Sequence, residues 1–473
     1  MNRRQLALLA GPFFFLLITF LPAPAGMSEA AKMTAAITVW MALWWIMEPV
    51  DIAVTALLPL VLFPLAGVAP LKNISGEYSN EIIFLFLAGF FFGKTIERWQ
   101  LHRRIALRLV LLLGSDPART VLGFMVAAAF ISMWISNTAT AVMMTPVAIA
   151  VARDAHFQEN NFRKSLLLGV GYACSIGGLA TIIGTPTNAI FLSYVQQKME
   201  LQVSFWQWFM FGFPFAFVLL LACWWLLLRI FPLKKNTGQN ADSRASIRAE
   251  LSLLGPVTPP ERRLMWLFGG VILAWVTGSL LWYHRLPNCN DTVVAVSGAI
   301  LLFLLPADNE KRPLLDWDTA LKIPWGIILL FGGGLALAKG FDQSGLAGWL
   351  GEQMKGLSTL SHVFILLVVL TVVVLLSEVA SNIATASMMM PVLAALATSI
   401  GAHPFGLLLS ATLAASFGFG LPVATAPNTI VYSSGFFTTR DMAKAGFLLD
   451  AVAIFLLLAF LYVLLPVVWG IRV

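Results

Sequence analysis

Charged residues are scarce in this sequence. Only 11% of its 473 residues are Asp, Glu, Lys or Arg, whereas 59% are hydrophobic. An ordinary soluble domain carries about 25% charged residues, which keep its surface solvated. The scarcity therefore excludes a soluble enzyme and a disordered chain, and it leaves a protein that crosses a membrane several times.

Cysteine clusters, metal-ligand patterns and nucleotide-binding loops are also lacking. Cys174, Cys223 and Cys289 form neither a disulfide framework nor a C-x-x-C pattern, and the five histidines are scattered. No Walker-type loop supports ATP-driven pumping, and we expect no organic cofactor. The net charge of +7 comes without a dense basic run. It is therefore attributed to basic residues on the cytoplasmic side, not to nucleic-acid binding.

Long, continuous apolar runs are present instead, such as FLLLAFLYVLLPVV at 455–468. A β-barrel would show short alternating segments, whereas a spanning helix needs roughly 20 apolar residues. The sequence thus predicts an all-α polytopic membrane protein with eleven transmembrane helices. The predicted spans are 5–21, 31–47, 51–68, 81–97, 165–195, 206–231, 263–283, 291–305, 324–340, 404–434 and 444–469.

Two further apolar stretches, 120–152 and 361–400, carry a polar Ser-Asn motif at mid-length. Polar groups at membrane depth must be satisfied inside the protein, so both stretches are predicted to be re-entrant hairpins. The spans 165–195 and 404–434 contain GTPTN and ATAPN. Pro removes a backbone donor and Gly weakens a helix, so both spans are predicted to be broken by an unwound segment.

The motifs recur at nearly constant spacing. SNTATAVMMTP (136–146) matches SNIATASMMMP (381–391), and IIFLFLAGFFFGKTIE (82–97) matches IILLFGGGLALAKGFD (327–342), both at an offset of 245. SIGGLATIIGTPTN (175–188) resembles SFGFGLPVATAPN (416–428) at an offset of 240–241. We infer an internal duplication, inverted because each copy holds an odd number of crossings. The predicted organisation is an N-terminal span (1–30), repeat 1 (31–231), a cytoplasmic linker (232–262) and repeat 2 (263–473).

Orientation follows from the distribution of Lys and Arg. With the N-terminus in the cytoplasm, most basic residues fall on that side, provided that both Ser-Asn stretches re-enter. Eleven crossings then leave the C-terminus outside. The N-terminus imitates a signal peptide, with Arg3 and Arg4 before an apolar run, but we expect it to be retained as the first span. The predicted location is the inner (plasma) membrane.

The paired motifs suit ion and anion binding. Ser, Asn and Thr cap helices, and a helix start presents free N–H groups and a positive dipole end to an anion. Hydroxyl, amide and carbonyl oxygens suit Na⁺. Small residues that merely pack helices are the alternative, and two copies in inverted halves argue against it. No Lys or Arg falls inside either cluster, so co-bound cations would help to hold the anion. Glu378 either adds negative potential near a cation or anchors its hairpin.

At these residues the sequence resembles the divalent anion–sodium symporter family, which includes di- and tricarboxylate carriers. The resemblance covers nearly the whole chain. It implies a homodimer in which scaffold domains hold moving transport domains that carry the substrate by an elevator mechanism. It also implies eleven spans with two re-entrant hairpins, and Na⁺ as the co-transported ion.

The resemblance also implies the site residues. The first Na⁺ site would comprise Ser132, Ser136, Asn137 and Gly184, and the second Ser377, Ala380, Asn382 and Ala424. The substrate would lie between Ser136, Asn137, Thr138, Thr185, Pro186, Ser381, Asn382 and Thr425. One departure is Ile383, which replaces the Thr of the family motif and supplies no hydroxyl. This change puts one substrate contact in doubt and with it the preference among succinate-like, citrate-like and keto acids.

The expected function is Na⁺-coupled symport of C4 dicarboxylates (succinate, malate, fumarate) into the cell. A dicarboxylate or tricarboxylate exchanger and a Na⁺/sulfate symporter of the same fold remain alternatives. An intramembrane enzyme would need converging His, Asp, Glu or Cys side chains, and only Glu378 approaches this description, so we expect no enzyme. A channel is disfavoured because two hairpins around one closed site indicate alternating access.

Overall fold

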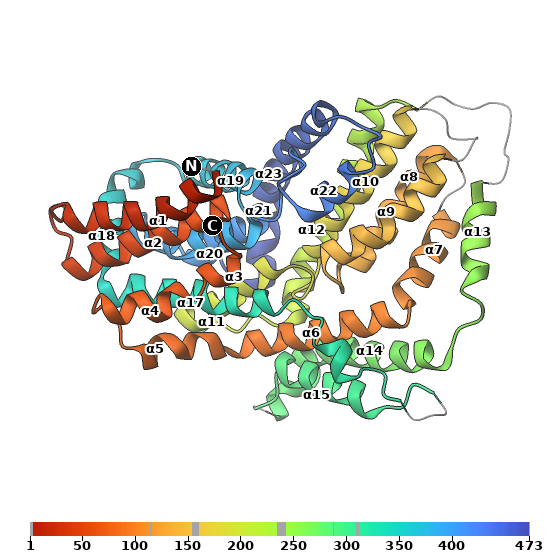
Figure 1. The fold of residues 1–473 in the computed structure, drawn as a ribbon, viewed down its shortest axis with the longest axis horizontal. Coiled ribbons are helices and arrows are strands. Elements are labelled where there is room, and N and C mark those ends of the chain that lie inside the picture. The colour runs from red at the N-terminus through yellow and green to blue at the C-terminus, as the bar shows by residue number, and fades with distance from the viewer. Residues whose placement is uncertain are drawn as a thin grey trace.

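The computed structural model describes residues 3–113, 116–153, 160–233, 243–286, 288–308 and 312–472. Within these ranges the chain is helical throughout (Figure 1), and the sole β-pairing is an isolated bridge between Pro306 and Pro313. Eight described helices or helix groups are long and apolar enough to cross a membrane. Large apolar side chains face outward, as with Phe20, Leu65 and Trp266, which are 84%, 80% and 78% exposed. The protein is thus a multi-pass membrane protein whose apolar surface suits lipid.

The N-terminal helices form one side of the molecule, where α1 and α2 lie beside α18 (Figure 1). Ser28 caps α2 through a hydrogen bond from the N–H of Ala31. The predicted span 51–68 contains two short helices, because Pro59 lacks an N–H and lies at the start of the second. The bounds are α1 Arg3–Phe20, α2 Glu29–Met47, α3 Ile52–Thr55, α4 Leu58–Leu65, α5 Leu71–Gly76, η1 Glu77–Ser79 and α6 Glu81–Arg98.

The helices that carry the first set of motifs lie at the other end of the molecule, where α8 and α9 pack against α10, and α7 packs against α8. Asp116 caps α8, and a capping box of Ser204 and Gln207 starts α12. The bounds are α7 Leu101–Leu113, α8 Pro117–Ser132, α9 Asn137–Arg153, α10 Asn160–Gly178, α11 Pro186–Met199 and α12 Phe205–Ile230.

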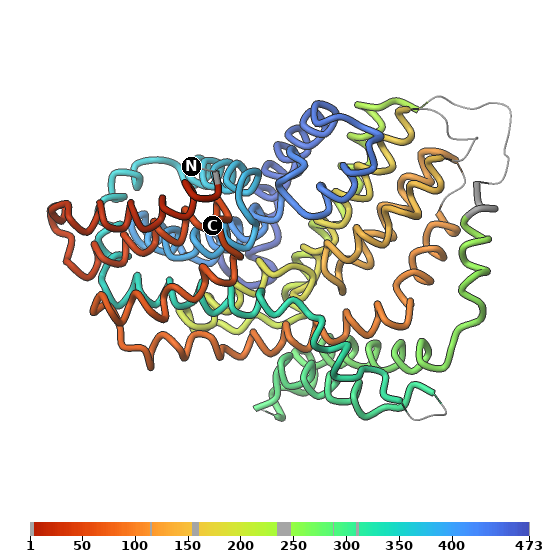
Figure 2. The backbone as a smooth tube through the Cα atoms, viewed as in Figure 1, coloured from red at the N-terminus to blue at the C-terminus, as the bar shows by residue number. Residues whose placement is uncertain are grey.

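The segment between the halves returns along α7 as α13 (Ser243–Leu253), as Figure 2 shows. Arg104, which is 4% exposed, binds the end of this segment. It forms an ion pair with Glu261 at 2.8 Å and donates hydrogen bonds to the carbonyls of Leu254 and Gly255. The predicted linker 232–262 thus ends in ordered contacts, while its residues 234–242 lie outside the described ranges.

The remaining helices belong to the second half of the chain. A capping box of Thr258 and Glu261 starts α14, and another, of Thr438 and Asp441, starts α23. The bounds are α14 Pro259–Thr277, η3 Gly278–Trp282, η4 Tyr283–Arg285, α15 Asp291–Leu304, α16 Trp317–Ala320, α17 Trp325–Ser344, α18 Leu346–Met354, η5 Lys355–Thr359, α19 His362–Val379, α20 Asn382–Ser399, α21 Pro404–Ala414, α22 Ala426–Tyr432 and α23 Thr439–Trp469.

Both halves contribute to the main apolar core. The rings of Phe191 and Phe405 meet with centroids 5.1 Å apart, and the Tyr172 hydroxyl donates to the Met442 carbonyl at 3.2 Å. This shared packing places the interrupted parts of both halves close together in the middle of the molecule.

Candidate functional site

The first Ser-Asn motif forms the turn between α8 and α9. Ser132, the last residue of α8, is fully buried, and its hydroxyl lies 2.7 Å from Asn137 Oδ1 and 2.6 Å from the Cys174 carbonyl oxygen. A hydroxyl has one proton and can donate to only one of these acceptors at a time. Three oxygens therefore converge around a single hydrogen.

The second Ser-Asn motif repeats this arrangement between α19 and α20. The buried Ser377 hydroxyl lies 2.8 Å from Asn382 Oδ1 and 2.5 Å from the Ala415 carbonyl oxygen. Again three oxygens share one hydrogen. We call these groups the first oxygen cluster (Ser132, Asn137, Cys174 carbonyl) and the second oxygen cluster (Ser377, Asn382, Ala415 carbonyl). Uncharged oxygen donors of this kind suit a hard cation.

Each half also contains an interrupted helix. The chain leaves helical geometry between α10 and α11, and Asn188 Nδ2 donates across this break to the carbonyls of Gly178 and Thr181 at 3.2 and 2.8 Å. Between α21 and α22, Asn428 Nδ2 likewise donates to the carbonyls of Gly418 and Leu421, at 2.9 and 3.0 Å. An asparagine side chain thus holds each break through two hydrogen bonds to backbone carbonyls.

The breaks precede the prolines that we expected to cause them. Pro186 is the first residue of α11, and Pro427 lies in the first turn of α22. A proline is favourable there because the first N–H groups of a helix have no intrahelical acceptor. The unwound segments therefore lie on the N-terminal side of the prolines, at 179–185 and 415–425.

Glycines bring the first tip against the first break. A Cβ on Gly178 would lie 2.7 Å from Asn137 Oδ1 and 3.1 Å from the Gly184 carbonyl oxygen, and a Cβ on Gly184 would lie 2.5 Å from the Gly178 carbonyl oxygen. Side chains do not fit at either position. The structure thus gathers Ser132, Asn137 and Gly184, three of the residues predicted for the first Na⁺ site.

The predicted residues of the second Na⁺ site also meet. Gly418 has φ +100°, and a Cβ there would lie 3.4 Å from the Ser377 carbonyl oxygen and 3.5 Å from Ala424 Cβ. Ala380 lies between Ser377 and Asn382 at the end of α19 and is 6% exposed. The backbone of the second break thus lies directly against the second tip.

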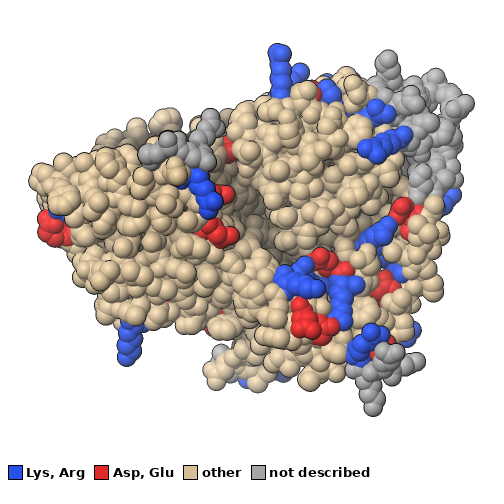
Figure 3. Space-filling model, in the orientation of Figure 1, with Lys and Arg blue, Asp and Glu red and all other residues tan. Residues whose placement is uncertain are grey.

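The predicted substrate residues are only partly together. Ser136 and Thr138 line a cavity of about 810 Å³, and Figure 3 shows a hollow near the centre of this face of the molecule. The other predicted substrate residues are not among its lining residues. Thr425 instead caps α22 by accepting from the Asn428 N–H at 3.2 Å. The residues outside this cavity lining are Asn137, Thr185, Pro186, Ser381, Asn382 and Thr425.

Two buried carboxylates at the second break had no assigned partner in the sequence. Glu378 accepts from the N–H groups of Gly420 and Leu421 at 2.6 and 2.8 Å, and Asp450 Oδ1 accepts from Gly418 and Phe419 at 3.2 and 3.4 Å. Glu378 therefore anchors the unwound segment and not only its own hairpin. Asp450 is 4% exposed inside α23. The sequence feature that could have identified Asp450 is an acidic residue within the apolar run GFLLDAVAIF.

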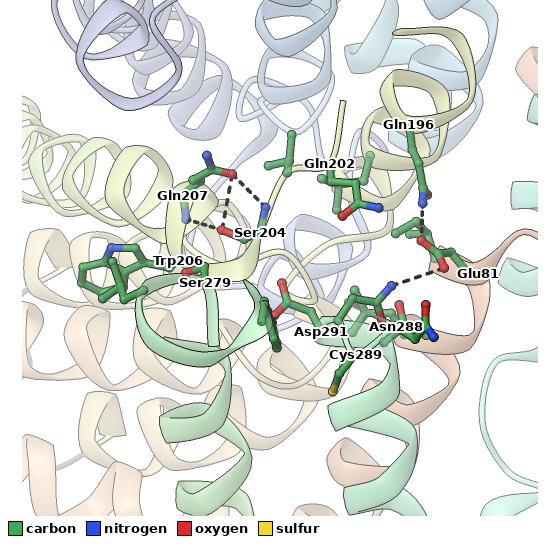
Figure 4. Close-up of a pocket in the computed structure, with 18 residues that line it drawn as sticks. Glu81, Gln196, Gln202, Ser204, Trp206, Gln207, Ser279, Asn288, Cys289 and Asp291 are labelled. Carbon is green, nitrogen blue, oxygen red and sulfur yellow. Dashed lines mark hydrogen bonds between the residues drawn. The ribbon is translucent and has the colours of Figure 1, made fainter. Parts of the chain in front are cut away.

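A second cavity, of about 610 Å³, lies between α6, α11, α12 and α15 (Figure 4). Its described lining contains Glu81 and Asp291 but no Lys or Arg. Figure 4 shows Gln196 pointing at Glu81, to which it donates a hydrogen bond. Two carboxylates repel a dianion, so this cavity does not suit an anionic substrate.

Comparison with known proteins agrees with this architecture. The model for "Sodium:sulfate symporter transmembrane region" matches residues 2–470. The "Sodium-dependent dicarboxylate transporter SdcS" of Staphylococcus aureus, in strains USA300 and MRSA252, is 39% identical over 99% of this chain and 92% of its own length.

Two solved structures share the fold. Neisseria gonorrhoeae MtrF aligns with a TM-score of 0.57 at 11% identity, covering 94% of this chain and 96% of its own. The YdaH transporter of Alcanivorax borkumensis aligns with a TM-score of 0.55 at 15% identity, covering 82% and 86%. With the family model matched over almost the whole length, the chain belongs to the sodium:sulfate symporter family, the divalent anion–sodium symporters that its motifs resemble, and is a membrane transporter.

Proposed function

We propose that this protein imports C4 dicarboxylates (succinate, malate, fumarate) by symport with Na⁺. The observation that carries the proposal is the pair of oxygen clusters at equivalent positions in the two halves. Each cluster holds three oxygens around one hydrogen. A cation placed among such oxygens relieves their mutual repulsion, which a hydrogen bond from one hydroxyl does only in part.

The first Na⁺ is held in this proposal by Ser132, Ser136, Asn137 and Gly184. The proximity of Asn137 Oδ1 to the Gly184 carbonyl, through Gly178, supports this set. The second Na⁺ is held by Ser377, Ala380, Asn382 and Ala424. Sodium dependence in the name of the Staphylococcus aureus relative also supports Na⁺ as the coupling ion.

The dicarboxylate then lies between the two tips, near Ser136, Asn137, Thr138, Thr185, Pro186, Ser381, Asn382 and Thr425. The N-termini of α9 and α20 supply N–H donors and positive dipole ends to its carboxylates. The two motif segments contain no Lys or Arg. The bound Na⁺ ions therefore supply the positive charge, which makes anion binding depend on Na⁺. Ile383 gives the site an apolar edge.

The proposed architecture is a homodimer of eleven-span protomers. α8–α9 and α19–α20 form the re-entrant hairpins, the N-terminus is cytoplasmic and the C-terminus outside. The burial of Ser132 and Ser377 supports tips that end within the protein and not in water. The hydrogen bonds repeated in the two halves support inverted repeats, in which transport domains move past a scaffold by an elevator mechanism.

The test is uptake of labelled succinate into proteoliposomes under an inward Na⁺ gradient or an equal K⁺ gradient. We expect uptake only with Na⁺. Asn137→Ala and Asn382→Ala each remove one oxygen from a cluster and should reduce Na⁺-driven uptake at least tenfold, because a buried polar partner is lost. Asn73→Ala, at an exposed position on α5, is the matched control.

Other outcomes would replace the proposal. Uptake that needs internal dicarboxylate but no Na⁺ would identify an exchanger. Sulfate uptake that succinate does not inhibit would identify a sulfate symporter. Wild-type Na⁺ dependence in either asparagine variant would remove that cluster from the Na⁺ sites.

A further inference from the structure

The cavity of about 810 Å³ has a largely apolar lining that also contains charged side chains. Ser136 and Thr138 of the first motif belong to this lining. Its mouth, which we call the vestibule mouth, is formed by Lys94, His102, Arg103 and Lys322, contributed by α6, α7 and the turn before α17. Figure 3 shows basic and acidic side chains together beside the central hollow.

Most of the charge at the vestibule mouth is compensated. Lys94 Nζ lies 2.6 Å from Glu97 Oε2, and Arg103 pairs with Glu250 of α13. Burial lowers the pKa of His102, whose Nδ1 faces the Ile96 carbonyl oxygen at 2.9 Å, and thus disfavours a positive charge on this imidazole.

Lys322 differs from these residues. It lies in the turn between α16 and α17, its side chain is exposed, and its ammonium group has no ion-pair or hydrogen-bond partner among the described residues. Of the acids nearest in sequence, Asp316 pairs with Arg98 at 2.6 Å, and Asp318 makes no ion pair with Lys322. Lys322 is therefore the uncompensated positive charge at the vestibule mouth.

We propose that Lys322 is a capture site for the dicarboxylate at the vestibule mouth, through which the anion passes between solution and the motif site. This inference rests on the proposed dicarboxylate transport. Lys322 does not form the motif site but raises the anion concentration above it, as a charge at the rim of a cleft does. A dianion about 7 Å from one positive charge in water is enriched about fivefold at ~10 mM ionic strength and about twofold at ~150 mM.

The cavity of about 610 Å³ differs in charge: its described lining offers Glu81 and Asp291 and no compensating cation. Of these two cavities, only the one lined by Lys322 offers an uncompensated cation among the described residues, and its mouth is cytoplasmic in the proposed orientation. Lys322 therefore acts where the anion leaves the carrier during import and enters it during efflux.

The experiment measures succinate transport in inverted and right-side-out membrane vesicles with the full-length chain. Lys322→Gln should raise the half-saturating succinate concentration about fivefold at ~10 mM ionic strength and about twofold at ~150 mM. The change should occur only in inverted vesicles, with the maximal rate unchanged. Lys322→Arg should behave like the wild type, because it keeps the charge. Lys72→Gln, another exposed lysine, on α5 outside the cavity, is the matched control.

An equal change in both vesicle orientations, a change that ignores ionic strength, or no change would overturn the role of Lys322. A wild-type protein without Na⁺-dependent succinate transport would instead overturn the proposed function. The two failures are therefore distinguishable in the same vesicles.

Discussion

The two interrupted helices are held by different chemistry. At the first break, the N–H groups of Leu179 and Ala180 donate to the carbonyls of Ile176 and Gly177 at 3.2 and 3.1 Å, as in a tightened helix end. The second break begins in the same way, with the N–H groups of Ser416 and Phe417, but the next four N–H groups donate to carboxylates. The position that corresponds to Glu378 in the first half, at the offset of 245, is Met133.

This difference shows that the two oxygen clusters can share one geometry and still differ in the charged residues around them. Glu378 follows Ser377 directly in α19 and is buried against the unwound segment, so an acidic residue lies next in the chain to the second oxygen cluster. The first cluster has the neutral Met133 in that place. A buried charge acts strongly on a nearby cation because little water screens it. We therefore expect the second Na⁺ site to bind its ion more tightly than the first.

The largest effect is predicted for Glu378→Gln. The variant keeps one acceptor oxygen and the shape of the side chain but loses the charge that holds Gly420 and Leu421. Hydrogen bonds to charged groups contribute about 1.5–3 kcal/mol each, so the Na⁺ concentration for half-maximal uptake should rise at least tenfold. Succinate uptake titrated with Na⁺ measures it.

The matched control is Met133→Leu at the corresponding position of the first half. It conserves volume and removes no charge, and the half-maximal Na⁺ concentration should change less than about twofold. Equal shifts in the two variants would contradict the electrostatic difference between the halves.

An intermediate and equal effect is predicted for Asn188→Ala and Asn428→Ala. Each removes two hydrogen bonds that cross a break in the same pattern. With about 1 kcal/mol for each bond, each variant should lose about 2 kcal/mol of stability. Thermal unfolding in detergent, together with uptake, measures the loss. If one variant were silent, the breaks would differ in more than their carboxylates.

The sequence predicted the parts of the site that depend on local pattern. Helix breaks, Ser-Asn turns and the pairing of the halves follow from apolar runs interrupted at a fixed offset. The register of the breaks was misjudged because Pro186 and Pro427 were read as breakers, whereas each lies in the first turn of its helix. A proline signals both situations equally, and only the neighbouring contacts distinguish them.

Contacts between segments that are distant in the chain could not be predicted from the sequence. Asp450 and Gly418 are 32 residues apart, and nothing in a single sequence pairs an acid in one helix with the amides of another segment. The eleven-span topology also rests on charge distribution, whereas length and apolarity alone identify eight described helices or helix groups. Nothing in the sequence distinguishes Lys322 from the other basic residues, and only the cavity lining does so.

The smallest effect is predicted for Ser175 and Ser416, which occupy corresponding positions in the two halves but differ in their hydrogen bonding. The Ser416 hydroxyl lies 2.8 Å from that of Thr187, whereas the corresponding Ser175 hydroxyl is buried with no hydrogen-bond partner among the described residues. Pro427 stands where Thr187 stands in the first half and offers no hydroxyl.

Ser416→Ala should therefore destabilise the protein by about 1 kcal/mol, because Thr187 loses its partner. Ser175→Ala removes an unsatisfied hydroxyl and should be neutral or stabilising. Unfolding midpoints in detergent compare the two, and an equal loss for Ser175→Ala would mean that its hydroxyl has a partner in the membrane.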